Sequence, residues 1–415
     1  MIGNFTRFDM SRRPNRQWRI LTLVTWLACI PKVLMHRTRI DKTGMPKGLK
    51  PPYFLLCNHN AFMDFLIMTR AIMPWRANYV VAIDAYIGLE FLLRGVGGIA
   101  IRKFTRSINL VKNMLHARNS GSIVALFPEA RYSLCGTSAV LPASLGKMVR
   151  KMNVPVVTLI MHGHHINCPF WHKGNRWVAP IESEMKQLFS KEETQTLSVD
   201  EINARIEEAF RYDDFAWQKE KGIRVKAKDR AEGLHKVLYQ CPVCHTEYKM
   251  SSSGSTLRCD YCGKAWEMDE LGSLSAQQGE TEFSHIPDWY EWERSNVRRE
   301  VREGAYSLQA EVRIESLPNA KGLVPFEKAG QLTHNGEGFT LSGEYENEAF
   351  TVHWPVPAMY SCHIEYNFKN RGDSLDLSNN EDTFFVFPQG DQFALTKIAL
   401  ATEELYYLHE EKISG

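Results

Sequence analysis

Short apolar runs alternate with amphipathic stretches along the first half of the chain. Each run ends at a polar residue, which is typical of a buried strand. The runs cover residues 53–57, 79–83, 99–101, 122–127 and 154–161. Helical patterns lie between them, as in residues 106–118. Strand and helix in alternation over about 150 residues predict an α/β domain, with a mostly parallel sheet flanked by helices.

The second half of the chain has a different pattern. Ser198 and Glu201 form a capping box, which predicts the start of a helix. Ser, Gln and Gly become frequent after Leu271 and indicate a linker, and residues 289–302 predict a charged helix. Short alternating runs separated by turn signals then indicate a small β-rich domain, which an amphipathic helix closes.

These patterns divide the 415 residues into six segments, which is consistent with two or three domains of about 150 residues each. The segments are a basic interfacial N-terminal helical segment (1–50), the α/β domain (51–215), a charged linker (216–237), a cysteine-containing unit (238–272), a linker with a helix (273–302) and a β-rich accessory domain (303–415).

Composition excludes a disordered or fibrous chain, because 44% of the residues are hydrophobic and 24% are charged. The formal net charge of +2 conceals a division between the two halves. Residues 1–180 hold 25 Lys and Arg against six Asp and Glu, a net charge of +19, and residues 181–415 carry −17. Such an asymmetry indicates an anionic partner for the basic half, either a nucleic acid, a membrane or a phosphorylated metabolite.

The apolar run at residues 20–31 lies between Arg19 and Lys32. Twelve residues are too few to span a bilayer. Basic flanks together with Trp18 and Trp26 favour a helix that lies in the membrane interface, and the alternative is a buried core helix with an exposed basic end. We expect no signal peptide, because arginines precede the run and no small-residue cleavage site follows it.

The first strand leads into a candidate catalytic pair, His59 and Asp64. On one continuous helix, residues five positions apart would lie about 140° apart. The two side chains can therefore meet only if His59 lies in the turn before a helix and Asp64 reaches back from its first turn. A carboxylate on one imidazole nitrogen would fix the tautomer and leave the other nitrogen free to act as a general base.

Charged residues follow two further strands of the predicted sheet. Arg102 and Lys103 come after one strand, and Glu129 and Arg131 come after the next. Residues just past the carboxyl ends of strands in an α/β sheet converge on one crevice. A base beside cations suits the deprotonation of a hydroxyl on a phosphate-bearing substrate.

This ordered set resembles the glycerolipid acyltransferase family, typified by the 1-acylglycerol-3-phosphate acyltransferases. The four blocks of that family read N-H-x-x-x-x-D, G-x-[IV]-x-I-x-R, F-P-E-G-T-R and V-P-[IV]-x-P, and the resemblance covers roughly residues 15–215. It implies His59 as the general base and Asp64 as its orienting partner. It also places a cation of the second block at the substrate phosphate. The consensus arginine aligns with Lys103, and Arg102 lies one position earlier, so both Arg102 and Lys103 remain candidates.

The third block is carried by residues 127–131, so the resemblance also places Glu129 and Arg131 at the phosphate. One residue is missing between these two side chains, and Ala130 stands where glycine is usual. In the fourth block, Thr158 stands where proline is common. These departures bear on the acceptor more than on the reaction.

The resemblance implies a membrane-associated enzyme that moves a fatty acyl group from acyl-CoA or acyl carrier protein to a lysophospholipid hydroxyl. Lysophosphatidic acid, giving phosphatidic acid, is the acceptor it favours. Glycerol 3-phosphate, another lysophospholipid, or a sugar or amino lipid are alternatives. A catalytically silent zinc-ribbon scaffold is an alternative from another class, against which the intact His59 and Asp64 argue. The sequence contains no G-x-S-x-G elbow, which counts against a lipase.

Histidines at positions 162, 164 and 165 follow the last predicted strand of the α/β domain. Three histidines in four residues suggest a metal site, but no cysteine or carboxylate accompanies them locally. We therefore interpret them as loop histidines near the crevice.

Two C-x-x-C pairs, Cys241 with Cys244 and Cys259 with Cys262, lie fourteen residues apart. This spacing predicts a zinc ribbon in which four thiolates hold a structural Zn²⁺ and leave no open coordination position. Residues 241–272 carry a net charge of −2, so we expect a protein contact or a structural joint rather than nucleic acid. No redox cofactor is expected.

The chain holds nine cysteines, an odd number that does not suit a disulfide framework. A reducing compartment fits better. Together with the basic interfacial segment, this predicts a cytoplasmic protein that is peripheral on the inner face of the membrane.

Overall fold

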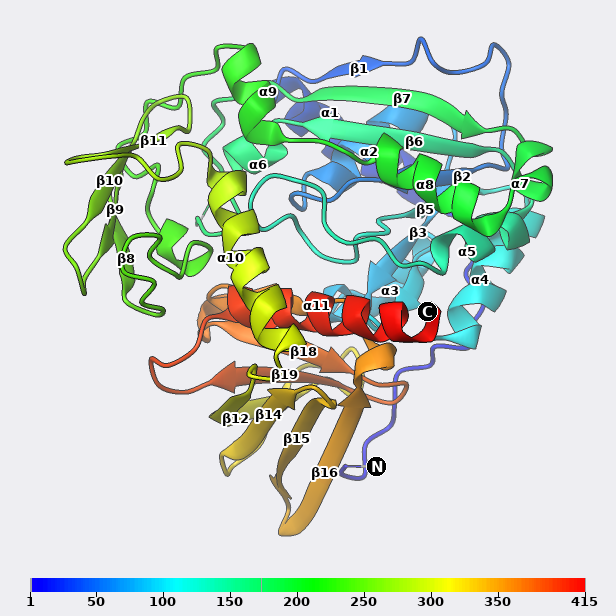
Figure 1. Cartoon of the computed structure of the whole chain (residues 1–415). Coiled ribbons are helices and arrows are strands. Elements are labelled where there is room, and N and C mark those ends of the chain that lie inside the picture. Colours follow the sequence, from blue (N-terminus) through cyan, green and yellow to red (C-terminus); the bar gives the residue numbers. More distant parts are fainter. Residues whose placement is uncertain (1, 173, 415) are drawn as a thin grey trace.

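Three sheets organise the computed structural model, which describes residues 2–172 and 174–414. A seven-stranded sheet, a four-stranded sheet and an eight-stranded sheet follow one another along the chain (Figure 1). The first sheet forms the α/β domain, the second forms the cysteine-containing unit, and the third forms the C-terminal domain.

The seven-stranded sheet has the order β1-β7-β6-β2-β5-β3-β4. Its strands are β1 (Arg39–Asp41), β2 (Phe54–Cys57), β3 (Ala77–Ala82), β4 (Ile99–Ile101), β5 (Ile123–Leu126), β6 (Val156–His162) and β7 (Glu182–Phe189). All neighbours are parallel except β6 and β7, which are antiparallel. The mostly parallel α/β sheet predicted from the apolar runs is therefore confirmed, with β1 lying in the segment that we assigned to the N-terminal region.

Helices cover both faces of this sheet. They are α1 (Arg19–Met35), α2 (Asp64–Ile72), α3 (Glu90–Gly95), α4 (Ile108–Asn119), α5 (Leu145–Met152), α6 (His164–Asn167), α7 (Glu193–Thr196), α8 (Val199–Ala209) and α9 (Asp214–Glu220), with the 3₁₀ turn η1 (Ile83–Tyr86). Successive residues of β2 point to opposite faces. Leu55 packs in a cluster with α1 and α2, whereas Leu56 packs in another with α4, α5 and α8. Because both faces are covered, β2 is wholly buried and lies at the centre of the domain.

The cysteine-containing unit is a small antiparallel sheet. It consists of the 3₁₀ turn η2 (Leu234–Lys236) and strands β8 (Met250–Ser253), β9 (Thr256–Cys259), β10 (Ala265–Met268) and β11 (Leu274–Ala276), in the order β11-β10-β9-β8. The hairpin between β8 and β9 turns at Gly254, where φ is +61°. The three serines before this turn, at positions 251–253, belong to β8 and pair with β9.

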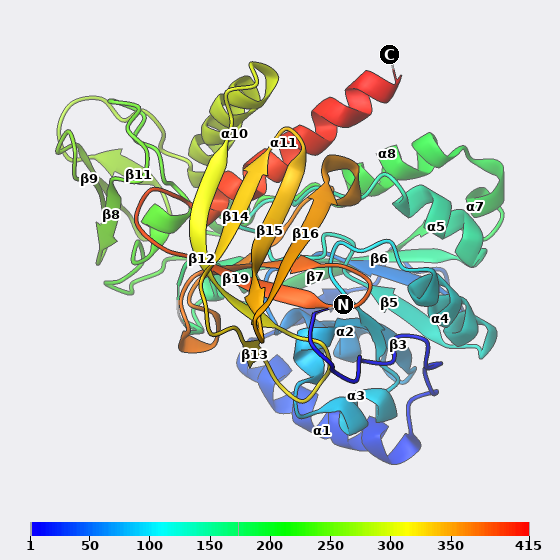
Figure 2. The ribbon, with the colours of Figure 1, turned by 90° about the horizontal axis from the view of Figure 1, so that it is seen from below.

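The C-terminal domain combines an antiparallel sheet with two long helices. Its elements are α10 (Ile286–Arg302), β12 (Leu308–Ser316), β13 (Val324–Pro325), β14 (Gly330–Asn335), β15 (Gly338–Tyr345), β16 (Glu348–Pro355), η3 (Val356–Ala358), β17 (His363–Glu365), η4 (Phe368–Asn370), β18 (Ser374–Ser378), β19 (Thr383–Pro388) and α11 (Leu395–Ser414). The helix α11 lies between this sheet and the α/β domain (Figures 1 and 2). The helix α10 begins beside the cysteine-containing unit and packs against α11.

The three units share buried apolar side chains. One cluster contains Leu134 of the α/β domain, Trp266 of β10 and Leu375 of β18. It also contains Val225 and Leu234, so the segment that we predicted to be a charged linker is packed into the interior. The joint between the units is therefore a shared core rather than a flexible connection.

The N-terminal residues also reach the C-terminal domain. The N–H group of Phe8 donates to the carbonyl of Pro318 at 2.9 Å, and the side chain of Asn319 donates to the carbonyl of Thr6 at 2.8 Å. Residues 6–8 thus lie against the segment that follows β12 of the C-terminal domain.

The helix α1 exposes large apolar side chains. Ile20, Leu27 and Leu34 are 70%, 71% and 70% exposed, whereas Cys29 and Val33 face the sheet. Within residues 2–172 and 174–414, no helix combines the length and the apolar character needed to cross a bilayer.

Candidate active site

His59 lies in the turn between β2 and α2, and Asp64 is the first residue of α2. Nδ1 of His59 lies 3.0 Å from Oδ2 of Asp64. The same carboxylate oxygen accepts hydrogen bonds from the backbone N–H groups of Asn60 and Ala61, at 2.6 and 2.9 Å. The turn thus closes around the Asp64 carboxylate, which reaches back to His59 from the first turn of the helix.

The carboxylate of Asp64 is completely buried. Burial alone would raise its pKa, but contacts with His164 and His59 outweigh burial and hold the pKa well below the usual 3.8. The contact with His164 joins Nδ1 of that ring to Oδ1, the carboxylate oxygen that His59 does not use. Asp64 therefore remains ionised at neutral pH and bridges two imidazole rings.

The ring of His59 is stacked on Phe127, with centroids 3.9 Å apart, and lies beside Tyr132. Burial lowers its pKa below 6.5, although the hydrogen bond with Asp64 opposes the shift. Its side chain is still 20% exposed, and among the described residues none hydrogen-bonds its Nε2. The ring is neutral at neutral pH and has one nitrogen free to accept a proton, as a general base requires.

Glu129, which follows β5, supports the same turn. Its Oε2 accepts the N–H of His59 at 2.7 Å, and its Oε1 accepts the N–H of Ala139 at 2.7 Å. Burial raises the pKa of Glu129 to about 8. Both carboxylate oxygens are thus committed to backbone groups, and the side chain fixes the position of His59.

Arg102, which follows β4, is buried under the C-terminal domain. Its guanidinium donates to the carbonyls of Leu317, Pro318 and Glu381 at 3.0, 3.1 and 2.9 Å, and to the hydroxyl of Thr383 at 2.9 Å. Burial lowers its pKa to about 10. These four hydrogen bonds fasten the α/β domain to the C-terminal domain.

Lys103, the next residue, lies near His59. Its positive charge helps to lower the pKa of His59. Its Nζ lies 3.1 Å from Asp376 of β18 and 3.5 Å from Asp84 of η1. Burial opposes its charge, but these carboxylates raise the pKa of Lys103 above its usual value. His363 of β17 lies 3.2 Å from the same nitrogen, so two C-terminal strands contribute to the surroundings of His59.

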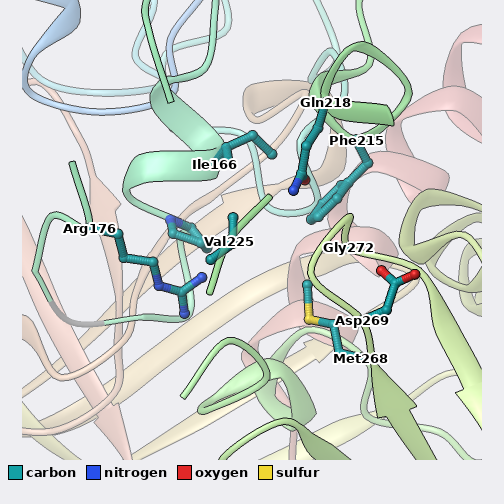
Figure 3. Close-up of a pocket in the computed structure, with 9 residues that line it drawn as sticks. Ile166, Arg176, Phe215, Gln218, Val225, Met268, Asp269 and Gly272 are labelled. Carbon is teal, nitrogen blue, oxygen red and sulfur yellow. The ribbon is translucent and has the colours of Figure 1, made fainter. Parts of the chain in front are cut away.

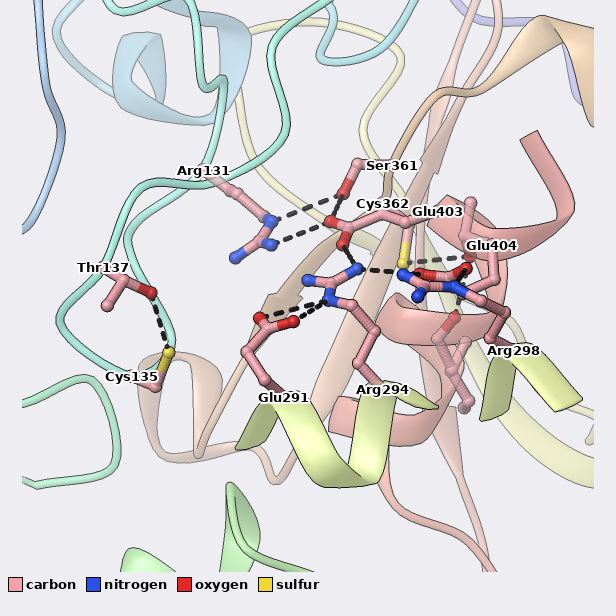
Figure 4. Close-up of polar contacts among 12 residues, drawn as sticks. Arg131, Cys135, Thr137, Glu291, Arg294, Arg298, Ser361, Cys362, Glu403 and Glu404 are labelled. Carbon is pink, nitrogen blue, oxygen red and sulfur yellow. Dashed lines mark hydrogen bonds and ion pairs between the residues drawn. The ribbon is translucent and has the colours of Figure 1, made fainter. Parts of the chain in front are cut away.

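Arg131 is held by Glu403 and Ser361 of the C-terminal region (Figure 4). It donates to Glu403 of α11 at 2.8 Å and to the hydroxyl of Ser361 at 3.3 Å. Arg294 of α10 lies 2.7 Å from the second oxygen of Glu403, and Arg298 pairs with Glu404. Arg131 is only 4% exposed, so this ion-pair network joins α10, α11 and the loop after β5 in the interior.

Three residues near the pair were not among our predicted site residues. His164 follows β6, which is the parallel neighbour of β2, so its position at the carboxyl end of that strand was a signal for its place in the site. His363 and Asp376 offered no such signal, because they belong to a β-rich domain without a recognisable motif.

The described residues enclose a small cavity at the joint between the α/β domain and the cysteine-containing unit (Figure 3). Its volume is about 10 Å³, and it is lined by Ile166, Phe215, Val225 and Met268 among others. This is room for about one water molecule. A larger surface hollow of about 300 Å³ lies between α4 and the C-terminal domain and is lined by Arg102, Arg106 and Ser107, among others.

The four predicted cysteine ligands lie together. Their sulfur atoms are within 4.8 Å of one another, with Cys241 and Cys262 at 3.7 Å and Cys244 and Cys259 at 3.7 Å. Tetrahedral Zn²⁺ with Zn–S bonds of about 2.3 Å would separate its sulfur ligands by about 3.8 Å. The cluster therefore fits a metal ion of this kind.

Part of the α/β domain matches a known protein family. Residues 35–162 match the family model described as Acyltransferase. This range runs from β1 to β6 and includes His59, Asp64, Glu129 and Arg131, so the predicted resemblance to the acyltransferase family is confirmed for this part of the chain.

Among solved structures, the chain is similar to the 1-acyl-sn-glycerophosphate (LPA) acyltransferase PlsC from Thermotoga maritima. The TM-score is 0.36 at 15% sequence identity, and the match covers 46% of this chain and 76% of that chain. No curated protein sequence is significantly similar to the chain.

Proposed function

We propose that this protein transfers a fatty acyl group from an acyl thioester, acyl-CoA or acyl carrier protein, to the hydroxyl of a lysophospholipid. Lysophosphatidic acid is the acceptor that the sequence resemblance favours. The observation that carries the proposal is the contact between His59 and the buried, ionised Asp64 within an acyltransferase-family domain.

In the proposed reaction, Nε2 of His59 accepts the proton of the acceptor hydroxyl while the hydroxyl oxygen attacks the thioester carbonyl. Asp64 holds Nδ1 and stabilises the imidazolium that forms. Collapse of the tetrahedral intermediate forms the ester and breaks the C–S bond, and the thiolate leaves with the proton returned by His59. A general base of this kind contributes on the order of 10²–10⁴ in rate.

The acceptor is the part of the proposal that most needs a direct test. Arg102, Lys103 and Arg131, which the resemblance places at the phosphate, hydrogen-bond or ion-pair with C-terminal residues. Separating a buried ion pair costs about 3–5 kcal/mol. A phosphate that recruits these cations would have to compete with those partners.

The experiment uses the full chain with radiolabelled acyl-CoA or acyl carrier protein and separates products by thin-layer chromatography. Lysophosphatidic acid, glycerol 3-phosphate and a lysophospholipid with a phosphodiester headgroup serve as acceptors. We expect a labelled product that His59→Ala abolishes and that His353→Ala, at an exposed histidine of β16, leaves unchanged. A catalytically silent scaffold would give no product that depends on His59.

The four-cysteine cluster is proposed to hold a structural Zn²⁺, which would join the turn at Cys241 and Cys244 to the end of β9 and take no part in acyl transfer. Metal analysis of the purified chain should give about one zinc per molecule. Cys259→Ser should lower this ratio, and Cys168→Ser, outside the cluster, should preserve it. Chain purified from zinc-supplemented cells without bound metal would contradict the assignment.

Association with the membrane is proposed to run through α1, on which Leu23, Leu27 and Leu34 are exposed. The helix begins at Arg19, three residues after Arg16. Apolar contact and attraction to anionic lipids both support such an interfacial helix. We expect the chain to sediment with vesicles that contain phosphatidylglycerol, and less with pure phosphatidylcholine. The double variant Leu23→Ser/Leu27→Ser should lose binding, and Tyr261→Ser, at an exposed aromatic of the cysteine-containing unit, should retain it.

A cytoplasmic location on the inner face of the membrane stays a prediction, as does a protein partner for the cysteine-containing unit or the C-terminal domain. Nucleic-acid binding is not expected, and fluorescence anisotropy with labelled duplex DNA would check this.

A further inference from the structure

The carboxylate of Asp64 has two oxygens with separate partners. Oδ2 accepts two backbone N–H groups and faces His59, whereas Oδ1 faces Nδ1 of His164. Asp64 and His164 are 0% and 1% exposed. Without His164, Oδ1 would be a buried charged oxygen with no hydrogen-bond partner among the described residues, a costly arrangement that favours rotation of the carboxylate.

The backbone holds His164 in this place. It is the first residue of α6 and follows Gly163, where φ is +95° and a Cβ would lie 2.4 Å from the carbonyl oxygen of Pro180. Asp214 of α9 accepts the N–H groups of Gly163 and His165 at 3.1 and 3.3 Å. The turn after β6 is thus fixed on both sides of His164.

The neighbouring histidines have other surroundings. His162 pairs with Asp214 at 3.0 Å, and His165 is buried between Trp171 and Phe215. Among the described residues of this cluster, His164 alone reaches Asp64. The contact with Asp64 is therefore specific to His164 and is not shared by the two other histidines of this segment.

The surroundings of His164 also define its tautomer. Its Nε2 is buried and has no hydrogen-bond partner among the described residues. A proton on that nitrogen would be an unsatisfied buried donor, so the proton belongs on Nδ1, where the Asp64 carboxylate accepts it.

We propose that His164 is a positioning residue for acyl transfer: its Nδ1–H donates to Oδ1 of Asp64 and orients the carboxylate so that Oδ2 holds His59. This inference rests on the proposed function. His164 does not touch the reacting atoms, and acts through Asp64 on the direction in which Nε2 of His59 points.

Steady-state kinetics of three variants test this role. His164→Leu fills a similar volume without a donor, and His164→Asn places an amide nitrogen near the position of Nδ1. Because a small displacement of a catalytic group can cost on the order of 10²-fold in rate, we expect His164→Leu to lower kcat about 10- to 100-fold with KM nearly unchanged. His164→Asn should recover most of this loss. His165→Leu, at an equally buried neighbour, should keep kcat.

A purely structural role for His164 would make the Leu and Asn variants equally slow, or would lower the melting temperature in proportion to activity. Either result overturns the inference, as does full kcat in His164→Leu.

A second measurement separates this inference from the proposed function. Nitrogen NMR of histidine-labelled full chain should show His59 protonated at Nδ1 in wild type, and a mixture of tautomers in His164→Leu. If wild type transfers no acyl group to any acceptor but the tautomers change as described, the proposed function fails and the positioning role stands. An unchanged His59 tautomer in His164→Leu refutes the positioning role whatever the activity.

Discussion

Asp64 and Glu403 are both fully buried carboxylates that contact two nitrogen-bearing side chains, but their partners differ. Asp64 holds two imidazoles from its own domain, and one of these, His59, keeps a free nitrogen at a partly exposed edge. Glu403 holds Arg131 and Arg294, which join the α/β domain to α10 and α11. An arginine cannot release its proton at any relevant pH, whereas an imidazole can exchange one near neutrality. The first arrangement therefore suits chemistry, and the second suits assembly.

The largest effect is expected from Asp64→Asn. An amide cannot stabilise the imidazolium that forms on His59 and favours the wrong tautomer, so kcat should fall on the order of 10³-fold or more. Measurement of kcat with the best acceptor checks this. Retention of a tenth of wild-type kcat would mean that Asp64 is no more than a structural residue, like Glu403.

Glu403→Gln should change stability and leave the chemistry in place. The substitution leaves the guanidiniums of Arg131 and Arg294 buried without their carboxylate, which costs about 3–5 kcal/mol of unfolding free energy. Urea unfolding at neutral pH would measure this loss, and the folded fraction should keep kcat within a few-fold.

The same variant has a defined pH dependence. Burial alone would raise the pKa of Glu403, but Arg131 and Arg294 hold it below 4.5. A lowered carboxyl pKa contributes stability that is complete above about pH 4.5 and is lost as the pH falls through the folded-state pKa. The difference between wild type and Glu403→Gln should therefore shrink in acid, and a difference independent of pH would contradict the ion-pair assignment.

The pH profile of activity should distinguish the two carboxylates. Because burial lowers the pKa of His59, the acid limb of kcat/KM in wild type should lie below pH 6.5. Asp64 raises that pKa, so the limb of Asp64→Asn should move to still lower pH, whereas Glu403→Gln should leave it in place. An acid limb above pH 7 in wild type would contradict His59 as the base.

The smallest effect on stability is expected at an exposed ion pair between α10 and α11. Arg302 of α10 and Glu411 of α11 lie 2.8 Å apart, and both side chains are about half exposed. Surface pairs contribute about 0–1 kcal/mol, so Glu411→Gln should change the unfolding free energy by less than 1 kcal/mol. A loss as large as that of Glu403→Gln would show that burial is not what separates these pairs.

The sequence predicted the core of the α/β domain well, because apolar runs respond directly to burial. The strand at residues 99–101 coincides with β4, and the capping box of Ser198 and Glu201 is present at the start of α8. Helix geometry set the condition that Asp64 must reach back from the first turn for the two side chains to meet, and the structure has that contact. The strand β7, which lies between β1 and β6, was not predicted, since Glu182, Glu184 and Lys186 interrupt its apolar pattern.

The surroundings of the cations were beyond sequence reasoning. Nothing in the neighbourhood of Arg131 indicates Glu403, which lies 272 positions further along the chain. Pairing across such a distance is decided by the packing of α11 on the α/β domain, and a charged residue after a strand has the same local pattern whether it faces a ligand or another domain. The sequence shows that a histidine stands at position 164. Its contact with Asp64 becomes apparent only from the position of β6 beside β2.

The hydrogen bonds of Arg102 have a consequence for synthesis on the ribosome. Its partner carbonyl at Glu381 is 279 positions away, so it is translated on the order of tens of seconds later, at about 5–20 residues per second. Until then the guanidinium lacks its hydrogen bonds to Glu381 and Thr383, and the face around β4 is not yet fully covered. The nascent α/β domain therefore acquires its finished interior only when translation approaches the last strands, and ribosome-bound chains halted before residue 381 should be markedly more sensitive to protease at this face than the completed protein.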